Sequence, residues 1–423
     1  MVKNITVSYG KGRLPTLTLD QEQKLKDMWA HFLNYCGSLP PNLKTTVSTL
    51  TQHSADTKQK KNGSSWFGRG KVEVIEDTPE MEFAAFKEAI KELPGDQVLK
   101  VTLQMVRFDH PDSLMLRFLR ARKWNVKNAL IMIGKTIHWR VTEGHPDKLL
   151  QTGEIGAIEN KYDDFMLQLR SGKGYIYGYD LNGRPVVHIH SDLHNPKAQE
   201  LKSVQDFTIY LLETGRLLLK DPVDTATVFF DLSKFGLSNM DYGVVKFLIA
   251  CFEGYYPETL GLMIIHKAPW VFSGIWNIIK NWMDPFVAQK IVFTKSYEDL
   301  LKYFPPEYIE KEHGGSDDYQ YKYIEPPAGE SAKINDNATR EKIFLQQEEL
   351  QQEFIEATIE WIKSSDKNTN QTSQARKNEI SARSADLYWI SDEYVRARSM
   401  IDRTGVLESF NKLHSTWVVS EPK

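Results

Sequence analysis

The sequence predicts an α/β fold in which helices cover a mainly parallel sheet, with further helices at both ends of the chain. From residue 175 to about residue 315, apolar runs of strand length alternate with segments of helical periodicity, as is typical of α/β domains. The stretch 255–293 shows this pattern most clearly. Leu260–Ile265 predicts a buried strand, Trp270–Met283 carries its large apolar residues at helical spacing, and Lys290–Thr294 predicts another strand.

Upstream of the alternating region the pattern is helical. Leu19–Tyr35 predicts a helix with Asp20 as its N-cap, and Glu80–Glu92 predicts a second helix. Asp112 and Asn125 are the expected N-caps of two short helices, which the tight connection between them makes antiparallel.

Within the alternating region, the first two strands are expected at Tyr175–Asp180 and Val186–His190. The Asn182–Gly183 pair between them predicts a hairpin turn. The elements that follow are a helix at Ser203–Lys220, a strand at Ala226–Leu232 and a helix at Asp241–Tyr255.

The last hundred residues contain no catalytic pattern. Ala338–Lys363 predicts a long helix, Ser364–Thr372 a mobile polar break, and Ala385–Ile401 a further helix. The chain is therefore divided by its sequence into five segments. They are an N-terminal helix (1–36), a flexible linker (37–75), a helical lobe (76–150), an α/β lobe (151–325) and a C-terminal helical extension (326–423).

Composition excludes several classes of protein. The 53 Lys and Arg residues nearly balance 56 Asp and Glu residues, so nothing points to a nucleic-acid partner. Only two cysteines occur, which favours a reducing, cytoplasmic location. No signal peptide and no run of 18 apolar residues is found, so any membrane contact is expected to be peripheral and transient.

The only dense group of metal-ligand residue types is His188, His190, Asp192 and His194. It approaches the HxHxDH pattern of binuclear metal hydrolases, but the last histidine comes one residue late, and no further ligands stand out downstream. We expect no metal and no cofactor, with His188 and His190 as a structural pair at a strand end. No GxSxG elbow or phosphate-binding loop occurs, so the chain is not expected to be an enzyme. A metal-dependent hydrolase is the weakest alternative.

The helix predicted at 270–283 has two interpretations. It is either a core helix covering the sheet or a movable lid over an apolar cavity, whose apolar face meets a bilayer when the lid opens. The residues concerned are Trp270, Val271, Phe272, Ile275, Trp276, Ile279, Trp282 and Met283.

Four motifs in order resemble the CRAL-TRIO lipid-carrier family. They are LRFLRARKWNV at 116–126, GYDLNGRPVV at 178–187, YYPETLGLMIIHKAPWVF at 255–272 and MDPFVAQKIVF at 283–293, followed by HGG at 313–315. Within that family the chain is most similar to fungal phosphatidylinositol transfer proteins related to the yeast secretory phosphatidylinositol/phosphatidylcholine transfer protein. The resemblance implies a helical N-lobe and a lipid-binding lobe whose sheet floors an apolar pocket, gated by the 270–283 helix.

The resemblance also implies which residues bind the lipid head group. The arginine of RAR, the glutamate of YYPE and the lysine before the last strand correspond to Arg122, Glu258 and Lys290. Arginine and lysine neutralise a phosphate, and a carboxylate accepts hydrogen bonds from inositol hydroxyls.

The sequence departs from the family where choline lipids are bound. Positions expected to carry hydroxyl groups are Val187, Ala226 and Val228, and with Phe230 they form an expected apolar pocket wall. We therefore expect phosphatidylinositol to exchange against a bulky neutral lipid, a sterol or squalene, rather than phosphatidylcholine. Exchange would proceed between membranes or present phosphatidylinositol to lipid kinases. The alternative is a lipid-filled interaction scaffold that binds a protein partner through its C-terminal helices.

Overall fold

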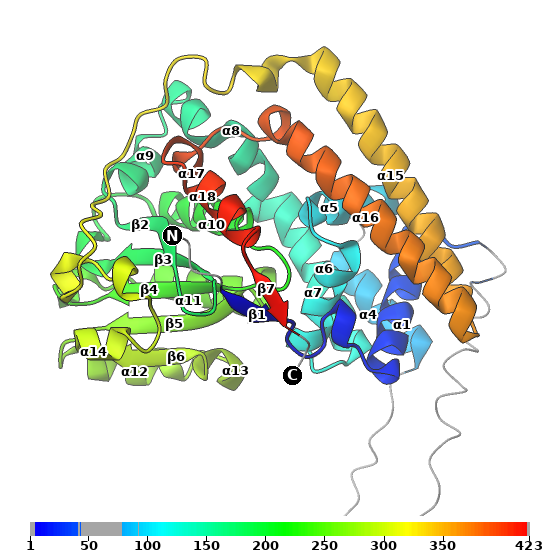
Figure 1. The fold of residues 1–423 in the computed structure, drawn as a ribbon, viewed down its shortest axis with the longest axis horizontal. Helices are drawn as coiled ribbons and strands as arrows, with labels where there is room; N and C mark the ends of the chain where they lie inside the picture. Colours follow the sequence, from blue (N-terminus) through cyan, green and yellow to red (C-terminus); the bar gives the residue numbers. More distant parts are fainter. Residues whose placement is uncertain (1–4, 41–42, 44–77, 92, 421–423) are drawn as a thin grey trace, which may run out of the picture. The chain divides into compact units, whose positions relative to one another are not determined.

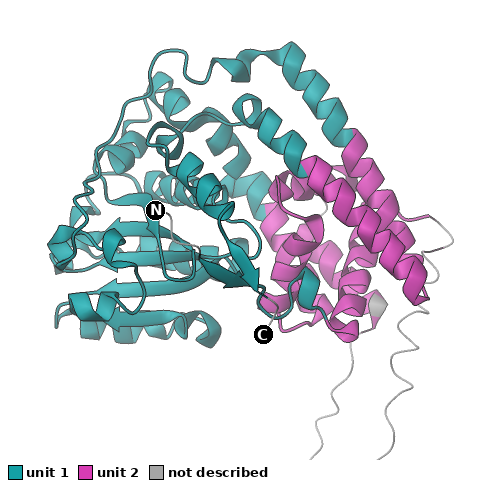
Figure 2. Ribbon diagram, in the orientation of Figure 1, with its two compact units in different colours: residues 1–17, 139–348, 385–423 teal, residues 18–138, 349–384 magenta. Residues whose placement is uncertain are grey.

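The computed structural model describes residues 5–40, 43, 78–91 and 93–420, so most of the predicted linker 37–75 lies outside the described residues. The chain forms two compact units (Figure 2). Unit 1 comprises residues 1–17, 139–348 and 385–423, and unit 2 comprises residues 18–138 and 349–384. Both units are thus built from segments far apart in the sequence, and the C-terminal extension belongs to both. The five predicted segments do not correspond to these units.

Unit 1 is built on a five-stranded sheet with strand order β2-β3-β4-β5-β6 (Figure 1). The hairpin predicted around Asn182 and Gly183 is confirmed, with β2 antiparallel to β3, and the other neighbouring pairs are parallel. The strands are β2 (Gly174–Tyr179), β3 (Pro185–His190), β4 (Ala226–Asp231), β5 (Leu260–His266) and β6 (Ile291–Thr294). The mainly parallel sheet and its α/β class therefore follow the prediction.

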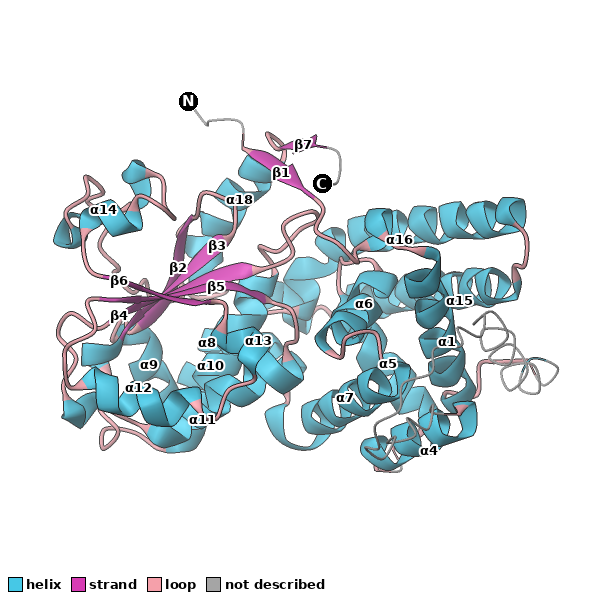
Figure 3. Ribbon diagram, turned by 90° about the horizontal axis from the view of Figure 1, so that it is seen from below, coloured by secondary structure: helices cyan, strands magenta, loops and turns pink. Residues whose placement is uncertain are grey.

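Helices cover both faces of this sheet, which Figure 3 shows nearly edge-on. One face carries α8 (Pro146–Glu159), α9 (Asp163–Arg170), α10 (Leu201–Arg216), α11 (Tyr242–Ala250), α12 (Phe272–Lys280) and α13 (Pro285–Ala288). The opposite face carries α14 (Tyr297–Leu300), and Leu300 and Phe304 pack there against Phe229 of β4. Both faces of the sheet are therefore covered, as expected of parallel strands.

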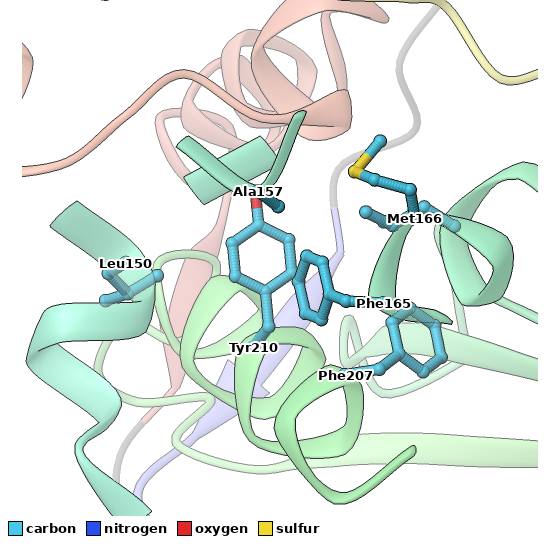
Figure 4. Packing of buried hydrophobic residues seen from close by; sticks show 7 residues of the cluster. Leu150, Ala157, Phe165, Met166, Phe207 and Tyr210 are labelled. Carbon is cyan, nitrogen blue, oxygen red and sulfur yellow. The ribbon is translucent and has the colours of Figure 1, made fainter. Parts of the chain in front are cut away.

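The helices α8, α9 and α10 form a core of their own (Figure 4). The rings of Phe165 on α9 and Tyr210 on α10 meet edge to face with centroids 5.5 Å apart. No element was predicted for residues 141–174, so α8 and α9 are additions to the predicted fold.

The terminal segments are also part of unit 1. β1 (Thr6–Ser8) pairs in parallel with β7 (Val418–Ser420), and α17 (Met400–Arg403) and α18 (Val406–His414) lie between α16 and β7 in the chain. Glu154 of α8 is fully buried, and its carboxylate is bound by the Arg403 guanidinium and the Tyr323 hydroxyl. Because a buried carboxylate requires such partners, this contact fixes the C-terminal segment on α8.

Unit 2 is helical. It contains α1 (Leu19–Tyr35), α4 (Pro79–Ile90), α5 (Gly95–Val106), α6 (Pro111–Ala121) and α7 (Val126–Trp139, up to residue 138). The long helices α15 (Asn337–Lys363) and α16 (Lys367–Val395) contribute residues to both units. Among the described residues, no helix has the length and apolar character needed to cross a membrane.

Several predicted helix ends are wrong. Thr18 rather than Asp20 caps α1, because its hydroxyl accepts the Gln21 N–H while the Gln21 side chain accepts the Thr18 N–H. The α12 helix spans 272–280 rather than 270–283, and the 241–255 segment ends in a π-turn after Ala250. The predicted cap Asn125 is confirmed, because its side chain accepts the Asn128 N–H. Asp241, predicted as the first residue of a helix, is the N-cap of α11 and accepts the Gly243 N–H.

The largest error concerns the C-terminal extension. A break was predicted at 364–372 and a helix at 385–401, whereas α16 is one continuous helix from Lys367 to Val395. The Asp366 carboxylate caps this helix by accepting the N–H groups of Asn368 and Thr369. The polar residues of this helix gave no sign of burial in the sequence, yet Lys377 is fully buried in unit 2.

Lys377 forms an ion pair with Asp112 of α6, which was predicted to be the N-cap of that helix. The Lys377 ammonium lies 2.8 and 2.7 Å from the two Asp112 oxygens, and the Trp29 indole N–H donates to the same carboxylate. His110 caps α6 instead, through its ring nitrogen. Burial raises the pKa of Asp112, but Lys377 and His110 outweigh it and hold that pKa below its ordinary value. The pair joins α1, α6 and α16 within unit 2.

We predict that Lys377→Met lowers the free energy of unfolding of unit 2 by about 3–5 kcal/mol, because it leaves the Asp112 carboxylate buried without its counter-charge. Urea denaturation followed by tryptophan fluorescence measures this change. The neighbouring Arg376→Met is the matched control, since Arg376 is half exposed in its pair with Glu360 and its loss should cost less than about 1 kcal/mol. Equal effects of the two substitutions would contradict the assignment.

Candidate functional site

Unit 1 contains an apolar cavity between the sheet and the helices α10, α11 and α12. Its volume is about 230 Å³. Its floor is formed by β3, β4, β5 and β6, and side chains from the three helices form its other walls. The floor residues are Val187, Ile189, Val228, Phe230, Met263, Ile265 and Ile291. Such an enclosed apolar space suits the hydrocarbon part of an amphiphile.

The two-residue period of the strands produces this floor. Val187, Val228, Met263 and Ile291 are register neighbours across β3–β6, so they form one row of side chains on the cavity face. The residues between them on the strands point to the opposite face. There Val186, Phe229 and Ile264 pack into a solid core with Leu300, Phe304 and Ile309.

The predicted pocket wall agrees in part with this floor. Val187, Val228 and Phe230 line the cavity, whereas Ala226 does not. Ala226 is on the same side of β4 but is its first residue, and it is only half-buried.

The helix α12 forms one wall of the cavity. Phe272, Ile275 and Ile279 are buried and pack against Ile265 of β5 and Leu232, which directly follows β4. Phe272 and Ile279 also line the cavity, together with the predicted gate residues Trp276 and Met283. The inward face of α12 therefore closes the space above β4 and β5.

The other predicted gate residues do not line the cavity. Trp270 precedes α12 and is 87% exposed, and Val271 is the half-buried N-cap of that helix. Trp282 follows the helix, and its ring meets the Tyr242 ring edge to face. Ile278 on α12 and Phe286 on α13 are also largely exposed, at 46% and 47%. The segment thus has an inward apolar face and a second set of apolar side chains in contact with solvent.

The chain is similar to known proteins along nearly its whole length. Residues 169–315 match the CRAL/TRIO domain and residues 82–135 match the CRAL/TRIO N-terminal domain. The phosphatidylinositol transfer protein CSR1 of Eremothecium gossypii is 36% identical over 96% of this chain and 100% of its own length. The chain belongs to the CRAL-TRIO family.

Two further comparisons describe the relatives of this CRAL-TRIO chain. The CRAL-TRIO domain-containing protein C3H8.02 of Schizosaccharomyces pombe is 36% identical over 98% of this chain and 96% of its own. The crystal structure of Sfh5 covers 62% of this chain and 97% of its own, with 18% identity and a TM-score of 0.42, too distant a likeness to add to the assignment.

Two of the three predicted head-group residues of the CRAL-TRIO site lie together in unit 1. The Lys290 ammonium is 3.7 Å from a Glu258 carboxylate oxygen, and both side chains are mostly buried. Lys290 comes directly before β6 and lies 4.5 Å from the ring centre of Phe286. Arg122 belongs to unit 2, where it is the C-cap of α6 and its guanidinium donates to the Ala121 carbonyl at 3.3 Å.

Arg13 adds a cation that the sequence analysis missed. Its guanidinium forms two hydrogen bonds with Asp224, at 2.9 and 3.3 Å. Burial alone would lower the pKa of Arg13, but the carboxylates of Asp224 and Glu258 raise it above its ordinary value. Glu258 therefore lies within electrostatic range of Arg13 as well as Lys290. No local motif marks Arg13, because only the fold of the N-terminal segment brings it here.

A second polar group borders the cavity at the end of β3. The Lys173 ammonium is 3.2 Å from His194 Nδ1, and His194 Nε2 is 3.4 Å from an Asp241 oxygen. Burial lowers the pKa of Lys173 to about 8, although Asp241 opposes the shift. The histidines of the motif therefore lie on different faces of the sheet. His194 borders the cavity, whereas His188 packs against Phe229 on the opposite face.

We predict that Val228→Phe and Val186→Phe, the same substitution on opposite faces of the sheet, differ in their cost. The larger ring at 228 enters the cavity, so the unfolding free energy should change by less than about 1.5 kcal/mol. At 186 the ring enters the packed core and should cost about 1–3 kcal/mol or more. Denaturant titration of both variants measures the difference, and equal costs would show that the cavity face is packed as tightly as the other.

Proposed function

We propose that this chain is a lipid transfer protein that binds and exchanges phosphatidylinositol. A relative that matches along its full length is named a phosphatidylinositol transfer protein, which supports the class of ligand. The observation that carries the proposal is the cavity, because its apolar floor and the inward face of α12 suit a buried acyl chain.

Selection of the lipid falls to the head group. Burial of one CH₂ group contributes about 0.8 kcal/mol, so a chain of roughly 18 carbons represents about 14 kcal/mol. A bilayer already provides that burial, and the protein and the membrane are therefore nearly matched for the tails. Only polar contacts to the head group can then favour one phospholipid over another.

We assign those contacts to Lys290, Glu258 and Arg122. Lys290 would neutralise the inositol phosphate and Glu258 would accept inositol hydroxyls, while Arg122 is assigned by the family motif alone. The Lys290 ammonium lies 3.7 Å from a Glu258 oxygen, so one head group could contact both side chains.

The second ligand is proposed to be a bulky neutral lipid, a sterol or squalene. Val187, Val228 and Phe230 line the cavity and offer no hydrogen-bond donor to a phosphocholine group. A volume of about 230 Å³ lies below the roughly 300–1,000 Å³ of ordinary ligand pockets, so a whole lipid requires the walls to part. The helix α12 is the wall we propose to move.

Lipid exchange would take place while the protein is docked on a membrane from the cytoplasm. Trp270, Ile278 and Phe286 expose apolar surface on and beside α12, where it can enter the bilayer interface as the inward face opens. The same docking could present phosphatidylinositol to a lipid kinase. The alternative is an interaction scaffold acting through residues 326–423, a segment that also supplies Lys377 and Arg403 to the two folded units.

We predict that Lys290→Ala reduces phosphatidylinositol transfer between vesicles by about 10–100-fold, the loss of one charge-assisted hydrogen bond. Transfer of a fluorescent sterol should stay unchanged, because a neutral lipid makes no phosphate contact. Lys295→Ala is the control, since this lysine follows β6 rather than preceding it. The head-group assignment fails if phosphatidylinositol and sterol transfer fall together or if neither changes.

We also predict that Trp270→Ala weakens binding to phosphatidylinositol-containing vesicles by at least about tenfold without changing the unfolding free energy, because the ring is 87% exposed. Vesicle co-sedimentation measures the effect. Ile390→Ala on α16 is the control, because Ile390 is also largely exposed, at 69%, but is far from α12 in sequence. Unchanged sedimentation of Trp270→Ala would contradict docking through this segment.

A further inference from the structure

The face of the sheet opposite the cavity carries a cluster of histidine and acidic side chains where the parallel strands end. His190 is the last residue of β3 and Asp231 the last residue of β4, and register pairs them. The segment after α14 brings Glu310, Glu312 and His313 to the same place. The downstream ligands that the sequence pattern of His188–His194 lacked are therefore supplied about 120 residues later, from a loop that no spacing rule connects to it.

The distances in this cluster suit ligands of one ion better than hydrogen bonds. His313 Nε2 lies 3.9 Å from Asp231 Oδ2 and 3.8 Å from an oxygen of both Glu310 and Glu312. Hydrogen bonds between such atoms are about 2.7–3.2 Å long. Two ligands of a tetrahedral zinc ion, each about 2.0–2.2 Å from the metal, are about 3.4 Å apart. In the triads His190–Glu310–Glu312 and Asp231–Glu312–His313, the ligand atoms all lie within 4.8 Å of one another.

The His313 side chain independently indicates that a further group binds in this cluster. The side chain is 4% exposed, and neither of its ring nitrogens has a hydrogen-bond partner, although Nε2 faces three carboxylates. A buried imidazole without partners is destabilising, so a group that binds Nε2 would relieve this cost.

The hydrogen bonds of Tyr175 direct a second nitrogen toward the same point. The Tyr175 hydroxyl donates its single proton to Glu310 at 2.9 Å, so it can only accept from His190 Nε2, which is 3.1 Å away. His190 Nδ1 lies 3.7 Å from Asp231 Oδ2, longer than a hydrogen bond, so a cation between them could bind both atoms. A hydrogen bond to the far ring nitrogen is also the usual arrangement behind a metal-bound histidine.

An ion can reach the cluster from solvent. His190, Glu310 and Glu312 line a polar pocket of about 780 Å³, to which Asp317 and Asp318 add further carboxylates.

We propose that His190, Asp231, Glu312 and His313 bind one divalent cation of the zinc class, with Glu310 and Tyr175 orienting the ligands. Two imidazoles and two carboxylates favour Zn²⁺ over Mg²⁺ or Ca²⁺, which prefer oxygen ligands alone. The ion would tie the loop at 310–313 to the ends of β3 and β4. Asp231, Glu312 and His313 do not line the lipid cavity, and His190 alone of the four ligands borders it, so the inference does not depend on the proposed lipid exchange.

The test is titration of the full-length chain, stripped with a chelator, with zinc chloride alone. Calorimetry should show one equivalent bound, and Glu312→Gln should weaken binding by at least about tenfold. The Glu312 side chain is 45% exposed, so this variant should fold even if His313→Gln does not. His414→Gln is the matched control, because both of its ring nitrogens also lack partners but its neighbour is the cation Lys220. It should bind zinc as the parent chain does.

A second readout is the rise in the midpoint of thermal unfolding on adding zinc, because an ion that binds only the folded chain stabilises it. The rise should appear in the parent chain and in His414→Gln and be reduced in Glu312→Gln. Absence of stoichiometric binding to the parent chain would overturn the proposal. Zinc binding by Glu312→Gln as tight as that of the parent chain would overturn it too, because the ion would then lie elsewhere.

Discussion

The alternation of side chains along β3, β4 and β5 is the constraint on which the rest of unit 1 depends. Because successive residues point to opposite faces, Val187 and Val228 floor a cavity while Val186 and Phe229 close a packed core. A shift of one residue in register would exchange the two faces and place histidines in the cavity. The sheet thereby separates an apolar cavity from most of a polar cluster at its strand ends, although both sites use β3 and β4.

Buried charges hold the segments that are distant in the sequence. Asp112 requires Lys377 across 265 residues, and Glu154 requires Arg403 across 249. Each pair contributes less to stability than its geometry suggests, since both charges lose their hydration. Loss of one partner is costly, however, so each pair fixes which helix lies against which within its own unit. The C-terminal extension is therefore structural, whatever else it binds.

Patterns of apolar residues were sufficient to predict the sheet, because the strands at 226–231 and 260–266 are continuous apolar runs between turn residues. They were insufficient for α16, whose face toward unit 2 is polar and is marked by a lysine rather than by leucines. In the candidate site, too, some residues could be predicted from the sequence and others could not. Local motifs indicated Glu258, Lys290 and α12, whereas Arg13 and the ligand cluster around His313 depend on contacts between distant segments, which periodicity does not record.

The proposed opening of α12 would expose apolar side chains, and the free energy that this costs depends on whether they meet water or a bilayer. Phe272, Ile275 and Ile279 are buried on its inward face, and exposing each to water would cost about 1.5–3 kcal/mol. Opening in water would therefore cost about 5–9 kcal/mol, so the open form would be scarce away from a membrane. At a bilayer the same side chains pass from one apolar medium to another, and most of that cost disappears. Trp270 and Phe286, already exposed beside the helix, would bring it to the one environment in which it can open.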